Sequence, residues 1–172
     1  MRSLRMKLIM IMVLLILALM TVVGSFLING VGNFYINEFY VQMGQTFSQD
    51  FIVQLQQIPG QEQDAPTKLK ELLMSQSNLG IDIASRNVYV LDKEANVLSS
   101  SNQSDQVTIT ANLLAAMNGE VGQDSSINAS YMDVAVPVHS TAGQYIVYIL
   151  DNKATVSNLN NQLFLLIMEA LL

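Results

Sequence analysis

The sequence contains no cysteine and only one histidine, and both shortages restrict the chemistry that it can perform. Without cysteine there is no disulfide framework, no thiolate metal site and no cysteine nucleophile. An imidazole titrates near neutral pH, but His139 has no second histidine or cysteine to complete a metal site. The chain also lacks a Gly-x-Ser-x-Gly motif and a spaced set of serine, histidine and aspartate. We therefore expect no catalytic residue.

Charged residues are scarce as well, at 13% of 172 residues, and they are unevenly distributed. Three of the eight basic residues lie at the N-terminal tip, at Arg2, Arg5 and Lys7. Residues 29–161 carry five basic and 13 acidic residues, a net charge of −8. Such an acidic segment argues against nucleic acid as a partner, since phosphates need basic contacts, and it would be repelled by anionic lipid headgroups.

Residues 8–28 form an uncharged run rich in Leu, Ile, Met and Val. At about 1.5 Å per residue, a helix of this length crosses a hydrocarbon core of about 30 Å. A cleaved signal peptide also has a basic tip, but its apolar run is usually about 7–15 residues, and residues 22–25 make a poor cleavage site. We expect a retained transmembrane helix, with residues 1–7 in the cytoplasm and the following segment outside.

A second apolar run occupies residues 162–172. As a helix this run would span only about 16 Å, roughly half of a bilayer. We expect it to be the start of a second transmembrane helix that is truncated at Leu172. Glu169 would be costly at membrane depth unless it has a partner. The alternative is an amphipathic C-terminal helix on the surface of the domain.

Residues 29–161, between the two apolar runs, predict one extracytoplasmic α+β domain. Its first helix is predicted by apolar residues at steps of three and four, and it should continue the membrane helix as a long stalk that ends at Pro59 and Gly60. These residues are Phe39, Met43, Phe47, Phe51, Leu55 and Ile58. A second helix should begin near Pro66 and stop at Gly80.

The apolar pattern then changes to the period of β-strands. Two β-rich runs separated by a turn predict a hairpin, Thr110 is placed to cap a short helix, and two longer alternating or apolar runs predict further strands. The strand segments are residues 87–92, 96–100, 131–139 and 144–150, and the short helix is 111–117. This order predicts helices flanking an antiparallel sheet of about five strands, followed by a helix after residues 151–153.

Two of these segments resemble extracytoplasmic PAS-like (single Cache) sensors. Residues 88–100 resemble the strand-Asp-x-x-Gly-strand hairpin of that family, and residues 134–138 followed by Gly143 are similar to its closing hairpin. Where the family has the hairpin glycine this chain has Ala95, so we expect Asn96 to take any left-handed turn position.

The layout of the whole chain, with one span, a long helix and a returning helix, is similar to the input half of sensor histidine kinases. The WalK-type kinases, which regulate cell-wall metabolism in Gram-positive bacteria, are the most similar. No phosphoacceptor histidine region or ATP-lid pattern occurs within the chain. The resemblance therefore implies that a HAMP-type linker, a dimerisation helix pair and an ATP-binding domain lie beyond Leu172.

Four side chains are candidates for binding an extracellular ligand. The planar guanidinium of Arg86 can hold two carboxylate oxygens at once, and Tyr89, Tyr131 and His139 could surround the same ligand. The alternative interpretation is a solvated arginine and an ordinary surface histidine. The acidic residues lack the spacing of an EF-hand loop, so we expect no metal and no cofactor. The ligand could be a cell-wall fragment or a membrane protein partner, or there could be no small molecule.

The leading hypothesis is the signal-sensing input region of a homodimeric two-component sensor histidine kinase in the cell membrane. Its apolar stalk is wider than one domain face needs, so part of it should contact a second protomer. The stalk residues proposed for that contact are Phe39, Tyr40, Met43 and Phe47. The alternatives are the sensor region of a chemoreceptor or cyclic-dinucleotide enzyme, and a stand-alone membrane-anchored binding protein.

Overall fold

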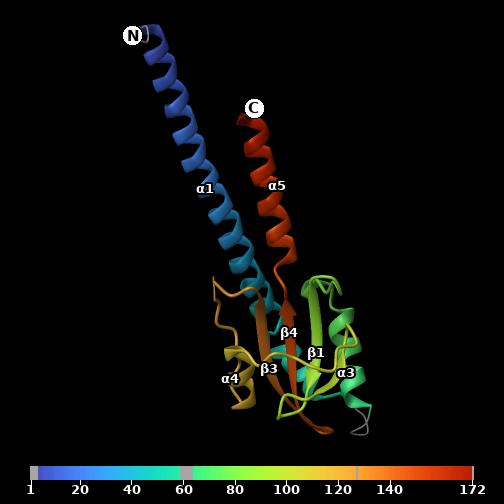
Figure 1. The fold of residues 1–172 in the computed structure, drawn as a ribbon. Helices are drawn as coiled ribbons and strands as arrows, with labels where there is room; N and C mark the ends of the chain where they lie inside the picture. Colours follow the sequence, from blue (N-terminus) through green and yellow to red (C-terminus); the bar gives the residue numbers. More distant parts are fainter. Residues whose placement is uncertain (1–3, 59–63, 127, 172) are drawn as a thin grey trace. The chain divides into compact units, whose positions relative to one another are not determined.

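The computed structural model describes residues 4–58, 64–126 and 128–171, and the chain divides into two compact units. The helical unit combines the chain up to Tyr35 with the chain from Thr155 onward, and the sheet unit is Ile36–Ala154. The element order, with helices before, between and after the strands, is that of an α+β protein, as the sequence predicts (Figure 1).

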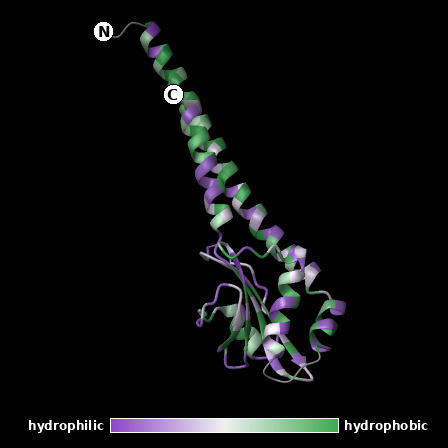
Figure 2. Cartoon of the chain, turned by 90° about the vertical axis from the view of Figure 1, so that its right-hand side faces the viewer, coloured by the Kyte–Doolittle hydropathy of each residue, from purple (hydrophilic) through white to green (hydrophobic). Residues whose placement is uncertain are grey.

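Helix α1, Leu4–Thr46, is one continuous helix of 43 residues that enters both units. No charged residue lies between Lys7 and Glu38, and the large apolar side chains of its first turns are exposed. Figure 2 shows this apolar character as the green segments of the N-terminal helix. By length and composition, α1 is able to cross a membrane. Gly30 and Gly32 do not interrupt it, so the predicted continuation from apolar helix to stalk is confirmed.

Helix α5, Ala154–Leu171, packs antiparallel against α1 inside the helical unit (Figures 1 and 2). A Cβ added at Gly24 would lie 2.9 Å from the Ile167 side chain, and one at Gly32 would lie 3.9 Å from Val156. Close contact at Gly24 is therefore possible only because this position has no side chain. Within the described residues α5 does not meet the length and composition criterion for a membrane span, so the expected second transmembrane helix is not shown.

The sheet has four antiparallel strands in the described part of the chain, in the order β2-β1-β4-β3 (Figure 1). They are β1 Arg86–Leu91, β2 Val97–Ser100, β3 Met132–Ser140 and β4 Gly143–Asp151. The expected fifth strand is not shown in the described residues, and an isolated bridge joins Gly122 to Ala135 at the outer edge of β3. Pro137 has no N–H to donate at that edge, so the pairing cannot continue along it.

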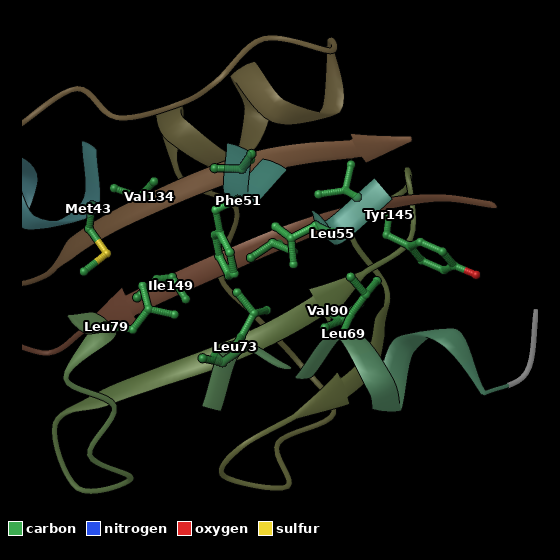
Figure 3. Packing of buried hydrophobic residues seen from close by; sticks show 14 of the residues in the cluster. Met43, Phe51, Leu55, Leu69, Leu73, Leu79, Val90, Val134, Tyr145 and Ile149 are labelled. Atoms are coloured by element: carbon green, nitrogen blue, oxygen red, sulfur yellow. The ribbon is translucent and has the colours of Figure 1, made fainter. Parts of the chain in front are cut away.

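One face of the sheet is covered by the last turns of α1 and by three further elements. These are α2 Gln49–Gln56, α3 Ala65–Ser75 and the 3₁₀ turn η1 Ser77–Leu79. Alternate strand residues meet the apolar sides of these helices, and Figure 3 shows Phe51, Leu73 and Ile149 among the side chains that converge there. This is the larger of two buried apolar clusters.

The predicted helix through Ile58 is in fact two helices, because the helical conformation is interrupted between Thr46 and Gln49. Ser48 is extended and stands at the N-cap position of α2, with Asp50 in the first turn. Serine at an N-cap and an acidic residue in the first turn are start signals for a new helix. The regular apolar spacing concealed this break.

The other face of the sheet is covered by α4, Ala111–Met117. The predicted cap is present, since the Thr110 hydroxyl accepts the N–H of Leu113 at 3.1 Å. The apolar cluster under α4 consists of Tyr89, Leu91, Leu113, Ala116, Ala135, Ile146 and Tyr148. The sheet therefore carries a separate core on each face.

The expectation for the β1–β2 turn was wrong in one detail. Ala95, and not Asn96, takes the left-handed conformation, with φ of 66°. One carboxylate oxygen of Asp92 accepts the N–H groups of Glu94 and Asn96 at 2.9 and 2.8 Å, and the other accepts the Asn96 side-chain amide at 2.8 Å. Asp92 holds Asn96 in place, so the preceding residue adopts the positive φ.

Candidate functional site

Arg86, at the start of β1, joins three elements of the sheet unit. Its Nε donates to Oδ2 of Asp151, the last residue of β4, at 2.9 Å. Its Nη1 donates to the Leu79 carbonyl at 2.9 Å and to Oε1 of Gln42 in α1 at 3.2 Å. The guanidinium also lies 4.9 Å from the centre of the Phe39 ring, close enough for a cation–π contact. The Nε and Nη1 donors of Arg86 are therefore already engaged within the chain.

The ion pair between Arg86 and Asp151 is largely shielded from water. The two side chains are 16% and 6% exposed. Removing one partner from a buried pair typically costs about 3–5 kcal/mol, because the other charge is left without compensation. The pair between Lys93 and Glu94, 3.5 Å apart and 69% and 60% exposed, is of the surface kind that contributes about 0–1 kcal/mol.

Asp151, which ends β4, and the two residues between it and α5 are held by hydrogen bonds. The second carboxylate oxygen of Asp151 accepts the N–H of Lys153 at 2.8 Å. Asn152 donates its N–H to Ser85 and its side-chain amide to Ala84, and its Oδ1 accepts the N–H of Ala154 at the start of α5 at 3.0 Å. We call Arg86, Gln42, Asp151 and Asn152 the junction cluster, because they connect α1, β1 and the first residue of α5.

The four predicted ligand residues do not form one site. Arg86 lies on the α1 face, whereas Tyr89 is buried on the α4 face, where its hydroxyl accepts from Asn102 at 2.9 Å. Tyr131 immediately precedes β3 and His139 is exposed near its other end. Tyr131 and His139 are eight residue steps apart, a distance of about 27 Å in a strand. These residues cannot enclose one small ligand together.

The predicted dimer-stalk residues contribute to the core of their own chain. Phe39 and Met43 are fully buried, while Tyr40 and Phe47 pack against the same cluster. The Tyr40 hydroxyl accepts the N–H of Asp133 at 3.5 Å, and burial raises the pKa of Tyr40 to about 12. Dimerisation stays a prediction, but a contact along this helix would have to use other positions, of which Val41 is 45% exposed.

A buried polar cluster around Asp133 was not predicted from the sequence. The Asp133 carboxylate is hydrogen-bonded by the hydroxyl of Thr110, by the hydroxyl of Tyr148 at 3.1 Å and by the amide of Asn112 at 2.8 Å. Asn112 also bonds the backbone of Asp124 in both directions. Burial raises the pKa of Tyr148 far above its ordinary value. We call these residues the Asp133 cluster, and its geometry attaches α4 to the sheet.

The one sequence signal for the Asp133 cluster is a charged residue inside an apolar strand pattern, between Met132 and Val134. A buried carboxylate needs partners, so its position in the strand implies hydroxyl or amide groups on the neighbouring layer. Among the described residues no group of three or more histidine or acidic side chains could hold a metal ion. The Asp133 cluster is therefore built from hydrogen bonds alone.

No protein-family model, no curated protein and no solved structure matches the chain.

Proposed function

We propose that this chain is the sensor and input region of a two-component sensor histidine kinase of the WalK type, with a PAS-like (single Cache) sheet unit outside the cell membrane. The observation that carries the proposal is the junction cluster. Arg86 bonds α1 and the end of β4 at the same time, and α5 begins three residues after Asp151. A change in the sheet is therefore coupled to both helices.

The coupling operates as a balance between two packings of the junction cluster. A ligand shifts such a balance only by its difference in affinity for the two packings. Moving a population from 1:99 to 99:1 takes about 5.5 kcal/mol. Leaving either Arg86 or Asp151 buried without its partner costs about 3–5 kcal/mol, which is of the same order. A packing that separates the two side chains therefore differs in energy from the paired one by an amount that a signalling ligand has to match.

The distribution of charge supports the topology. Arg2, Arg5 and Lys7 precede the apolar turns of α1, and basic residues are retained on the cytoplasmic side of a membrane helix. The sheet unit carries the acidic excess and would be repelled by anionic headgroups. The basic tip is then cytoplasmic and the sheet unit extracytoplasmic.

The proposal is tested first by reading the coding sequence that follows Leu172. We expect a linker, a helix with a phosphoacceptor histidine and an ATP-binding domain. A chemoreceptor signalling helix, a cyclic-dinucleotide enzyme domain or a stop codon would contradict the kinase assignment. In the full-length kinase, reconstituted in lipid, Arg86→Met should change the rate of autophosphorylation with ATP. Lys70→Met, which removes a charge from α3, should leave the rate unchanged.

The homodimer is tested by cysteine crosslinking. This chain has no native cysteine, so an introduced cysteine is its one thiol. In membranes, Val41→Cys should form disulfide-linked dimers, because this exposed side chain lies next to the buried stripe of α1. Met43→Cys should not, since Met43 is fully buried. Equal crosslinking at the two positions, or crosslinking at neither, would argue against a dimer along this helix.

A further inference from the structure

A pocket of about 190 Å³ opens on the sheet unit near the hairpin that connects β3 and β4. Three separate segments line it: the β1–β2 turn, the C-terminal end of α4 and the β3–β4 hairpin. Its polar side chains include Lys93, His139 and Gln144, and its apolar wall includes Met117, Pro137 and Ile146. The junction cluster lies at the other end of β4, where that strand ends at Asp151.

The one charged side chain among the described residues that line this pocket, Lys93, is positive, whereas the unit around it is acidic. Lys93 is one of only five basic residues in the acidic segment 29–161, and His139 is the single histidine of the chain. No aspartate or glutamate is among the described residues that line the pocket. Glu94 pairs with Lys93, but both side chains are well exposed, so this pair is weak and the lysine can turn towards a ligand.

The end of α4 does not account for Lys93 and His139 at this place. The carbonyls of its last turn already accept N–H groups from the residues that follow: Ala115 accepts from Asn118 and Glu120, and Ala116 accepts from Gly119, each at 3.0 Å. The helix end is therefore satisfied within the chain and does not need Lys93 or His139 as a cap.

We propose that this pocket binds a small organic carboxylate. Lys93 and His139 would hold the carboxylate, Gln144 would donate a further hydrogen bond, and the apolar wall would contact the carbon part of the ligand. The apolar wall favours such a ligand over an inorganic anion. The volume equals that of about six water molecules at ~30 Å³ each, so the ligand has about six non-hydrogen atoms. This is smaller than the ligands of typical drug-sized pockets.

The role of this site in signalling rests on the proposed function, whereas the binding itself does not. Gln144 lies near the start of β4 and Asp151 at its end, so one strand connects the pocket with the junction cluster. The kinase assignment is tested by the sequence beyond Leu172 and the pocket by direct binding. A failure of one is therefore distinguishable from a failure of the other.

His139 is the single histidine of the chain, so the NMR spectrum has one set of imidazole resonances. These resonances report directly on the pocket. The full chain in lipid nanodiscs is titrated with sodium lactate at constant pH and ionic strength, with sodium phosphate and neutral lactamide as controls. We expect a saturable shift of the His139 resonances with lactate in the millimolar range, and none with lactamide. Lys93→Met should weaken binding at least tenfold, while Lys70→Met should not change it.

Three results would overturn the proposal. The first is the absence of a saturable shift at tens of millimolar lactate. The second is an equal response to lactamide, which would remove charge recognition, and the third is an equal response to phosphate, which would show a site for inorganic anions only. Lys93 is exposed in a turn, so the melting temperature of Lys93→Met should stay within a few degrees of that of the unmodified chain, which separates lost binding from lost folding.

Discussion

Replacing Arg86 by methionine should destabilise the sheet unit more than any substitution of an exposed charge. The substitution keeps much of the side-chain volume but leaves the Asp151 carboxylate, which is 6% exposed, without its charged partner. The Leu79 carbonyl and Gln42 lose a donor at the same time. We expect a loss of about 3–5 kcal/mol in the free energy of unfolding.

The same reasoning predicts how the loss is reversed. Since the cost comes from an uncompensated buried charge, the double variant Arg86→Met/Asp151→Leu should regain part of the stability that Arg86→Met loses. For a unit of the size of Ile36–Ala154, 1 kcal/mol corresponds to about 3–6 °C in melting temperature. Arg86→Met should therefore melt about 10 °C or more below the unmodified chain.

The assay is thermal melting of the full chain in detergent, followed by the near-ultraviolet circular dichroism of the buried tyrosines Tyr89 and Tyr148. Lys93→Met is the matched control, because it breaks an ion pair that is exposed, and it should shift the melting temperature by no more than a few degrees. If Arg86→Met and Lys93→Met melt at the same temperature, the junction cluster does not have the energy assigned to it.

Three further predictions concern the cores and the absence of a metal. Burial raises the pKa of Tyr40 to about 12 and raises that of Tyr148 further. Above pH ~10 these tyrosines are therefore deprotonated in the unfolded state while they stay protonated in the folded state. For each of the two tyrosines, the free energy of unfolding then falls by about 1.4 kcal/mol per pH unit. Urea denaturation at pH 9–12 measures this slope, which Tyr148→Phe should reduce; a flat profile would contradict it. In the same assay at neutral pH, Gly122→Ala should cost about 1–3 kcal/mol or more, because its Cβ would lie 2.0 Å from the carbonyl oxygen of Asn112. Gly44→Ala, in an open helical position, should instead gain about 0.5–1 kcal/mol, and a reversed order would refute the packing described. Addition of EDTA should leave the melting temperature unchanged, and a decrease would reveal a metal site.

Much of the fold follows from apolar periodicity, because each element buries one side. The spacing of apolar residues predicted α3 and the long α1, the cap residue Thr110 predicted α4, and the β-rich runs predicted all four strands to within one residue at each end. The break at Ser48 was missed because apolar spacing continues across it. The strand count failed because pairing at the edge of β3 depends on Pro137 and Gly122, which a single-strand pattern does not reveal.

The candidate sites were harder to predict than the elements, because each depends on contacts between distant segments. Arg86 stands out in the sequence, but its partner Asp151 is 65 residues away and is brought to it by the pairing of β1 with β4. The opposite directions of Arg86 and Tyr89 follow from the alternation of side chains along β1, because the two positions are three residues apart. Likewise, the partners of Asp133 lie on α4, at positions that become visible only when the helix is placed on the sheet.

The location of the sheet unit is the central claim, and site-specific labelling with a membrane-impermeant maleimide tests it most directly. Ser125→Cys places a thiol at an exposed position of the sheet unit, and Met6→Cys places one beside the basic tip. In intact cells Ser125→Cys should react at once, while Met6→Cys should react only after lysis. If Ser125→Cys is labelled only in lysed cells, the sheet unit lies inside the cell and an extracytoplasmic sensor is excluded.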